Sequence, residues 1–216
     1  MTEKLLNAVA VKFPLTEMDA GEYATMKVSG MNFKIRAYHA QGLGTVSVMT
    51  ASGFFGLMKM DTLIINPTQV DMPLLSYDRV LAMGNDTLIY ELYDTMTAPA
   101  QLDALDDVKQ AYATEPDHDL GEHWYDAIKL SQSLSKKGKK PHRQSFDALT
   151  QAYMDAYLEL CAAALGCDED TKREKASVYV EGLLSNGGPS TDVFKKGIGD
   201  EKTAYLFRHI LFGTAK

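Results

Sequence analysis

The sequence predicts an α+β fold in which one antiparallel sheet is covered by helices. Residues 23–92 are short apolar runs separated by glycine and polar residues, a pattern typical of strands joined by tight turns. From Pro99 onward, apolar residues recur at every third or fourth position, which is the spacing of helices. Because strands followed by helices form the α+β pattern, we expect residues 1–216 to make a single domain of this class.

The strand-rich half is expected to consist of consecutive hairpins, which implies antiparallel pairing. A turn over 29–32 separates the first two runs, and Gly84-Asn85-Asp86 is the strongest tight-turn signal in the chain. The runs expected to form strands are 23–28, 33–37, 45–49, 54–60, 63–65, 79–83 and 87–93, with a further strand over 128–134.

The second half is expected to be helical. Leu102 to Tyr112 forms one apolar stripe, and 146–164 and 172–184 are longer amphipathic segments. Gly187-Gly188-Pro189 then breaks the chain before Ser190 and Thr191, which are suited to cap a last pair of helical turns.

Composition excludes several classes of protein. The 45% apolar and 24% charged content excludes a disordered chain, and the net charge of −7 argues against a general nucleic-acid or membrane binder, because either would need a basic face. No apolar run approaches the roughly 20 residues of a membrane-spanning helix. Cys161 and Cys167 are six residues apart on an expected helix and point to different faces, so we expect no disulfide and a cytoplasmic protein.

Asp78 is the acid of most interest. Apolar residues flank it on both sides, which places its carboxyl group on a sheet rather than on an outer turn. A carboxyl group in an apolar pocket has a raised pKa and is able to deliver a proton near neutral pH. Taken alone, the residues favour the alternative, an ion pair with Arg79 or an acid at a strand end.

Two charged segments have competing interpretations. The basic run of residues 136–143 is either a solvated turn or a site for ligand carboxylates, phosphates or an acidic partner. His118 and His123 are five residues apart beside Gly121, which does not match a helical zinc spacing, so we expect a loop and no metal site there.

Two motifs of the chain are similar to those of one protein family. The first is Asp71-Met72-Pro73-Leu74-Leu75-Ser76-Tyr77-Asp78-Arg79-Val80, which resembles the central motif of the ferredoxin-dependent bilin reductases. The second runs from Ser190 to Phe212 and is similar to the family's closing helix, with Trp124 between the two motifs. The resemblance covers residues from about Met31 to Phe212.

The resemblance implies a three-layer α/β/α sandwich, related to the red chlorophyll catabolite reductase-type fold, that holds a linear tetrapyrrole between the sheet and the C-terminal helices. No tightly bound metal or flavin is expected; reduced ferredoxin or flavodoxin would supply single electrons. Asp78 matches the catalytic aspartate of the family. Lys136 falls where the family has an arginine that pairs with a bilin propionate, and Lys137, Lys139 and Arg143 extend that basic site.

The chain departs from the family at three positions. The histidine of some members falls at about Thr62, the sheet glutamate at about Val48 or Met49, and the second aspartate at about Gly188. Thr62, Met49 and Gly188 are therefore expected to line the ligand site, with Asp78 as its one remaining acid. The resulting expectation is an oxidoreductase acting on a linear tetrapyrrole such as biliverdin. The alternatives are a non-catalytic tetrapyrrole carrier of the same fold and a pocket for an unrelated apolar ligand.

Overall fold

The computed structural model describes residues 1–215, the side chain of Pro189 excepted. Its centre is an open antiparallel sheet with the strand order β1-β3-β4-β5-β6-β7-β8, and β2 pairs with β3 beside this path. The strands are β1 (Leu15–Met18), β2 (Thr25–Val28), β3 (Met31–Ala40), β4 (Gly44–Gly53), β5 (Met58–Pro67), β6 (Leu74–Ala82), β7 (Asn85–Tyr93) and β8 (Leu134–Lys139).

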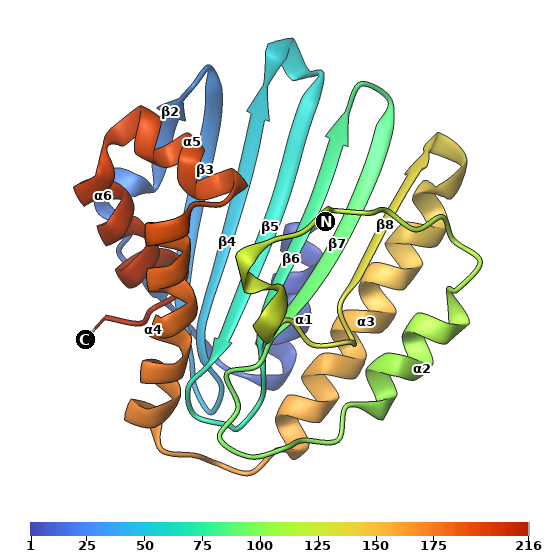
Figure 1. Ribbon diagram of the computed structural model, residues 1–216, viewed down its shortest axis with the longest axis vertical. Helices are drawn as coiled ribbons and strands as arrows, with labels where there is room; N and C mark the ends of the chain where they lie inside the picture. The colour runs from blue at the N-terminus through green and yellow to red at the C-terminus, as the bar shows by residue number, and fades with distance from the viewer. Residues whose placement is uncertain (216) are drawn as a thin grey trace.

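Helices cover both faces of this sheet, so the molecule has three layers (Figure 1). One face carries α1 (Thr2–Lys12), α2 (Asp103–Ala111) and the long α3 (Arg143–Ala163). The other carries α4 (Glu169–Asn186), α5 (Pro189–Ile198), α6 (Asp200–Tyr205) and a π-helical turn, Leu206–Leu211. The predicted α+β fold class and the α/β/α sandwich are confirmed.

The central strands are buried on both faces, and alternate side chains enter separate cores. Val48, Leu63 and Tyr77 pack toward α1 and α3, whereas Met49 and Ile64 pack toward the C-terminal helices. A shift of one residue in strand register would exchange the two sets of side chains. Register therefore decides which residues reach a site on either face.

The turn between β6 and β7 differs from the expected one. It consists of Met83 and Gly84, both with positive φ (50° and 79°), so Ala82 pairs with Asn85. We expected a three-residue turn over 84–86. The two-residue turn prevails because two left-handed residues match the right-handed twist of the flanking strands.

Other boundaries also differ from expectation. Phe54–Gly56 is a short 3₁₀ turn rather than strand, and α1 has no counterpart among the expected elements. The basic run expected to be a loop begins inside β8, whereas 128–133 lies before that strand. The differences at 54–56, 128–133 and 136–139 arise at the ends of strands, where pairing with a neighbouring strand outweighs the local pattern.

Candidate functional site

A cavity of about 280 Å³ lies between the sheet and the C-terminal helices. Its floor is formed by strands β4 to β7, and its walls come from the loop before β8, from α4 and from the C-terminal segment. The lining residues are Met49, Met60, Thr62, Ile64, Ser76, Asp78, Val80, Ile89, Glu91, Tyr93, Leu120, His123, Tyr125, Tyr179, Leu183, Gly188, Ser190, Thr191, Phe207, Leu211 and Phe212. Most are apolar or aromatic, with a few polar groups, as is usual for a small-molecule site.

Asp78 occupies the floor of this cavity. It lies directly opposite Thr62 on β5 and opposite Ile89 on β7, and the Thr62 hydroxyl donates a hydrogen bond to Asp78 Oδ1. Loss of hydration and, more weakly, the nearby charge of Glu91 outweigh the hydrogen bonds from Thr62 and Ser76, and together they raise the pKa of Asp78 to about 6. Asp78 is therefore poised to hold or release a proton near neutral pH.

Glu91 is a second carboxyl group on the same floor. It lies opposite Ser76, two positions along β6 from Asp78, so both side chains project into the cavity. The Tyr93 hydroxyl donates to Glu91 Oε2 at 2.6 Å, and Lys129 Nζ lies 3.8 Å from Oε1, which accepts no hydrogen bond among the described residues. The cavity thus contains two acids rather than the single acid expected.

Aromatic rings form one wall of the cavity. Tyr93 stacks on Tyr179 of α4 with ring centroids 4.0 Å apart, and Tyr125 meets Tyr93 edge-on at 5.6 Å. Trp124 donates from Nε1 to the carbonyl of Gly187 at 3.1 Å, and its ring occupies the space above Gly182 where any Cβ would clash. These contacts fix the loop that brings His123 and Tyr125 to the cavity.

The C-terminal segment closes another side. Ser47 donates to the carbonyl of Leu211, and Asn66 donates to the carbonyl of Phe212, each at 2.7 Å in buried surroundings. These bonds tie the end of the π-helical turn to β4 and β5, and so place Phe207, Leu211 and Phe212 over the floor. Such π-helical turns occur frequently at functional sites.

Four of the eight predicted site residues meet in this cavity. Asp78 and Thr62 come from the floor, Met49 from β4, and Gly188 from the junction of α4 and α5, more than a hundred residues away in sequence. The structure therefore brings these residues together at one site. Their roles toward a ligand remain predictions.

The four basic residues lie elsewhere. Lys136 is opposite Leu88 and so lies on the α3 face of the sheet, where its Nζ donates to Asp117 and to the carbonyl of Glu115. Arg143 is at the start of α3 and lies 3.4 Å from Asp86 on that same face. Lys137 and Lys139 are exposed on β8, outside the cavity lining. Alternation along β8 sends Lys136 to the α3 face, whereas Lys137, opposite Thr87, and Lys139, opposite Asn85, lie on the Asp78 face but outside the lining of the cavity.

Asp71, the first residue of the central motif, contributes to the stability of the fold. The Asp71 carboxylate accepts from the backbone of Thr97 at 2.8 Å and of Ala98 at 2.9 Å, and it lies 3.6 Å from the fully buried Lys172 Nζ. Lys172 also donates to the carbonyls of Met72 and Thr95 at 2.7 and 2.9 Å. This cluster joins the start of β6, the segment after β7 and α4, all of which frame the cavity.

Glu91, Tyr93, Tyr179 and His123 were not identified from the sequence. A two-residue turn at 83–84 would have placed Glu91 on the face of Asp78, whereas the expected three-residue turn places it on the other face. The loop expected over 118–123 is confirmed as a loop, but His123 at its end lines the cavity.

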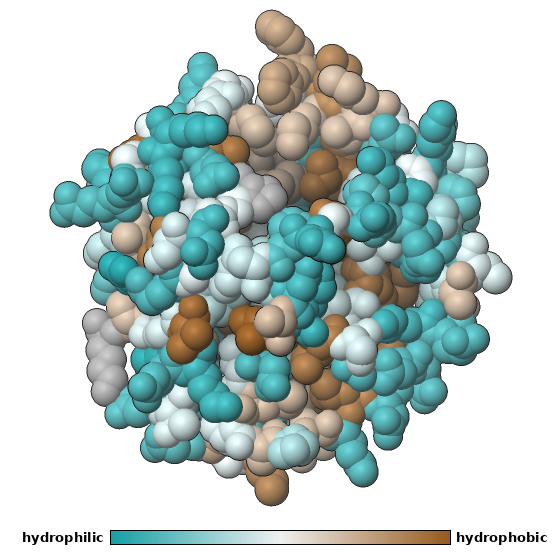
Figure 2. Space-filling model, in the orientation of Figure 1, coloured by the Kyte–Doolittle hydropathy of each residue, from teal (hydrophilic) through white to brown (hydrophobic). Residues whose placement is uncertain are grey.

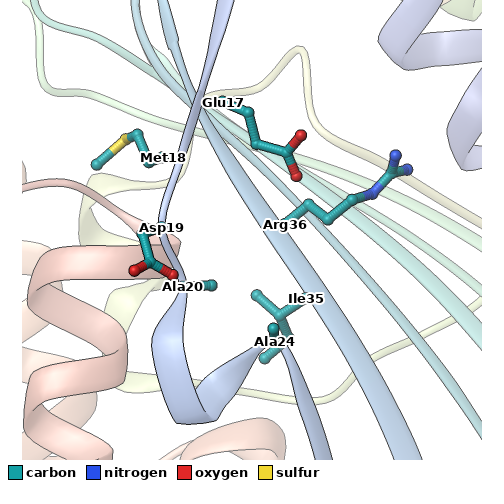
Figure 3. Close-up of a pocket in the computed structure, with 7 residues that line it drawn as sticks. All are labelled: Glu17, Met18, Asp19, Ala20, Ala24, Ile35 and Arg36. Atoms are coloured by element: carbon teal, nitrogen blue, oxygen red, sulfur yellow. The ribbon is translucent and has the colours of Figure 1, made fainter.

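A second hollow, of about 350 Å³, lies at the other edge of the sheet. Figure 3 shows Glu17 of β1 and Arg36 of β3 extending toward one another at its rim. Arg36 also pairs with Glu3 of α1. No group of metal-ligating side chains is present here or elsewhere among residues 1–215, and none of the helices described is long and apolar enough to cross a membrane.

No protein-family model matches the chain, and no curated protein matches it. A solved structure does: selenomethionyl phytochromobilin synthase from tomato in complex with biliverdin, with a TM-score of 0.77 and 14% sequence identity. The match covers 99% of this chain and 83% of that chain. The two proteins share a fold.

Proposed function

We propose that the chain binds a linear tetrapyrrole in the Asp78 cavity and reduces it, with Asp78 as proton donor and reduced ferredoxin or flavodoxin as electron donor. The observation that carries the proposal is the position of Asp78: a carboxyl group with a pKa of about 6 on the floor of a largely apolar cavity. The fold match supports the ligand class, because the tomato protein is bound to biliverdin.

Reduction of one double bond consumes two electrons and two protons. Asp78 is the first proton source and, once reprotonated from solvent, also the second; the Glu91 carboxylate on the same floor raises the pKa of Asp78 and so favours that reprotonation. Tyr93, which donates to Glu91 Oε2, orients that carboxyl group toward the cavity. Asp78 would hand each proton to the pyrrole system as the single electrons arrive.

The size and the lining of the cavity indicate how the ligand would lie in it. Its volume of about 280 Å³ is just below the usual range for ligand sites, so a four-ring chain extends beyond it. No lysine or arginine is among the described residues that line it. We therefore expect the propionates to lie at the mouth in water, with the pyrrole N–H groups toward Asp78 and Glu91.

The test is a titration of purified protein with biliverdin, followed by visible absorption. Binding should perturb the bilin spectrum, and anaerobic addition of reduced ferredoxin should convert the bound pigment to a reduced product. Asp78→Asn should bind biliverdin with similar affinity and form product at least about a hundredfold more slowly, the usual contribution of a general acid. No spectral change with any linear tetrapyrrole would exclude the proposal.

A second candidate is a tetrapyrrole carrier without turnover. It is favoured by Thr62 and Met49, which line the cavity where the family resemblance places a histidine and a glutamate. For a carrier, biliverdin binds but reduced ferredoxin leaves the bound pigment unchanged. The same titration separates the two candidates.

A further inference from the structure

Four large apolar side chains project from one end of the sheet. They are Phe54, Phe55 and Leu57 between β4 and β5, and Met83 between β6 and β7, with exposed fractions of 62%, 108%, 68% and 90%. Figure 2 shows apolar side chains projecting at the end of the molecule where Figure 1 places the β4–β5 connection. The two turns touch, because the Met83 N–H donates to the Leu57 carbonyl. We call these four residues the apolar tip.

The backbone of the apolar tip is strained. Phe54, Phe55 and Met83 have φ of 50°, 55° and 50°, in the left-handed region that large side chains rarely adopt. Turns of this kind normally carry asparagine, aspartate or glycine, which adopt the conformation at lower cost. Folding therefore gains nothing from phenylalanine or methionine here. Strained residues with exposed apolar side chains point to a role outside the fold.

Basic side chains surround the apolar tip. The segments 27–34, 52–60, 80–87 and 137–143 form this end of the sheet, and every exposed charged residue in them is basic: Lys27, Lys34, Lys59, Lys137, Lys139, Lys140 and Arg143. Their one acid, Asp86, is fully buried and paired with Arg79 and Arg143. Two acids border these segments, Glu115 paired with His142 and Asp117 paired with Lys136, and the seven exposed basic side chains outnumber them. We call these basic residues the basic collar.

We propose that this end of the sheet docks on an anionic lipid bilayer, with the apolar tip in the headgroup region and the basic collar against the lipid charges. Apolar side chains ahead of a ring of lysines match the order of layers in such a membrane, an apolar interior beneath a negative surface. A second copy of the chain is a poorer occupant, because its own basic collar would repel this one. A folded acidic protein is the competing occupant, and in the test below it predicts no flotation of the wild type with anionic vesicles.

The test is vesicle flotation with the full chain. Phosphatidylcholine vesicles with and without about 30% phosphatidylserine are compared at low and high salt. Binding is expected to the anionic vesicles and to fall with salt. Phe54→Ser/Phe55→Ser should weaken that binding at least about tenfold, and Lys139→Glu/Lys140→Glu should do so on anionic vesicles only. Val178→Ser and Lys4→Glu, exposed changes elsewhere, serve as matched controls and should have no effect.

A further variant separates binding from folding. Phe55→Asn suits the left-handed backbone, so its thermal unfolding midpoint should equal or exceed that of the wild type while vesicle binding is lost. The proposal is overturned if the wild type does not float with anionic vesicles, or if the tip variants float as well as the wild type. Self-association in sedimentation velocity that Phe55→Asn abolishes, without vesicle binding, would also overturn it in favour of a second copy.

Discussion

Thr62 and Asp78 face each other across β5 and β6, and the Thr62 hydroxyl donates to the Asp78 carboxyl group on the floor of the cavity. This hydrogen bond favours the charged carboxylate, whereas loss of hydration and the charge of Glu91 favour the neutral acid. The second influence prevails, and the pKa of Asp78 is raised to about 6. A group of this kind links the stability of the fold to pH.

Asp78→Asn should stabilise the protein at pH 8. The folded-state pKa lies above the unfolded value of about 3.9, so the native state binds the proton more tightly, and this stabilisation is lost as pH rises through 6. The variant has no carboxyl group there and lacks that loss. Between pH 4 and pH 8, the free energy of unfolding of the wild type should therefore fall by about 2 kcal/mol more than that of the variant. Urea denaturation at both pH values measures it. A pH-independent difference between the two proteins would contradict the shifted pKa.

Glu91→Gln should lower the pKa of Asp78. The substitution keeps the volume of the side chain and removes the negative charge that raises that pKa. The carboxyl ¹³C resonance of Asp78, followed from pH 3 to 9, gives the value directly. Glu17→Gln, at the other edge of the sheet, is the matched control and should leave it unchanged. If Glu91→Gln has no effect on the titration, the two acids do not interact.

Gly182→Ala should loosen the aromatic wall. A Cβ at position 182 would lie 2.1 Å from the Trp124 ring, so the ring must move and its hydrogen bond to Gly187 must break. Because Trp124 is the single tryptophan, its fluorescence reports the change as a red shift toward the emission of a solvated indole. Biliverdin affinity should fall several-fold as the His123–Tyr125 loop shifts. Gly166→Ala, with no atom nearer than 3.6 Å, is the control.

Lys136→Met and Arg143→Met should leave tetrapyrrole affinity within about twofold of the wild type, a difference of less than half a kcal/mol. Both side chains lie on the α3 face of the sheet and cannot reach the cavity. By contrast, Gly188→Leu should weaken binding at least about tenfold, because Gly188 lines the cavity in extended backbone that accepts any side chain. A tenfold loss in Lys136→Met would contradict the assignment of the ligand to this cavity.

Lys172→Ala should destabilise the protein by about 3 kcal/mol, since it removes the fully buried donor of two carbonyl groups and the cationic partner of the Asp71 carboxylate. Lys172→Met keeps most of the volume and still lacks the donor, so it should lose nearly as much. Thermal and urea unfolding measure both. If the methionine variant is as stable as the wild type, packing rather than hydrogen bonding is what Lys172 contributes.

The amino-acid pattern by itself determined the order of strands and helices and singled out Asp78 as a candidate. Short apolar runs before Pro99 and three-to-four-residue spacing after it are local signals, and they predicted an antiparallel sheet covered by helices; the three-layer sandwich was predicted by the family resemblance. The apolar flanks of Asp78 likewise predicted a carboxyl group carried on the sheet, because a buried strand is recognised by the apolar residues in its own sequence.

Only the tertiary structure decided which other residues share that site. A strand exposes alternate residues to opposite faces, so a turn one residue shorter than expected moved Glu91 beside Asp78, and the pairing of β8 with β7 sent Lys136 to the far face. Gly188 and His123 come from segments that are far from β6 in the chain. The packing of α4 and of the Trp124 loop brings both residues to the cavity. Such pairings depend on register and on contacts between distant segments, which no local pattern of residues encodes.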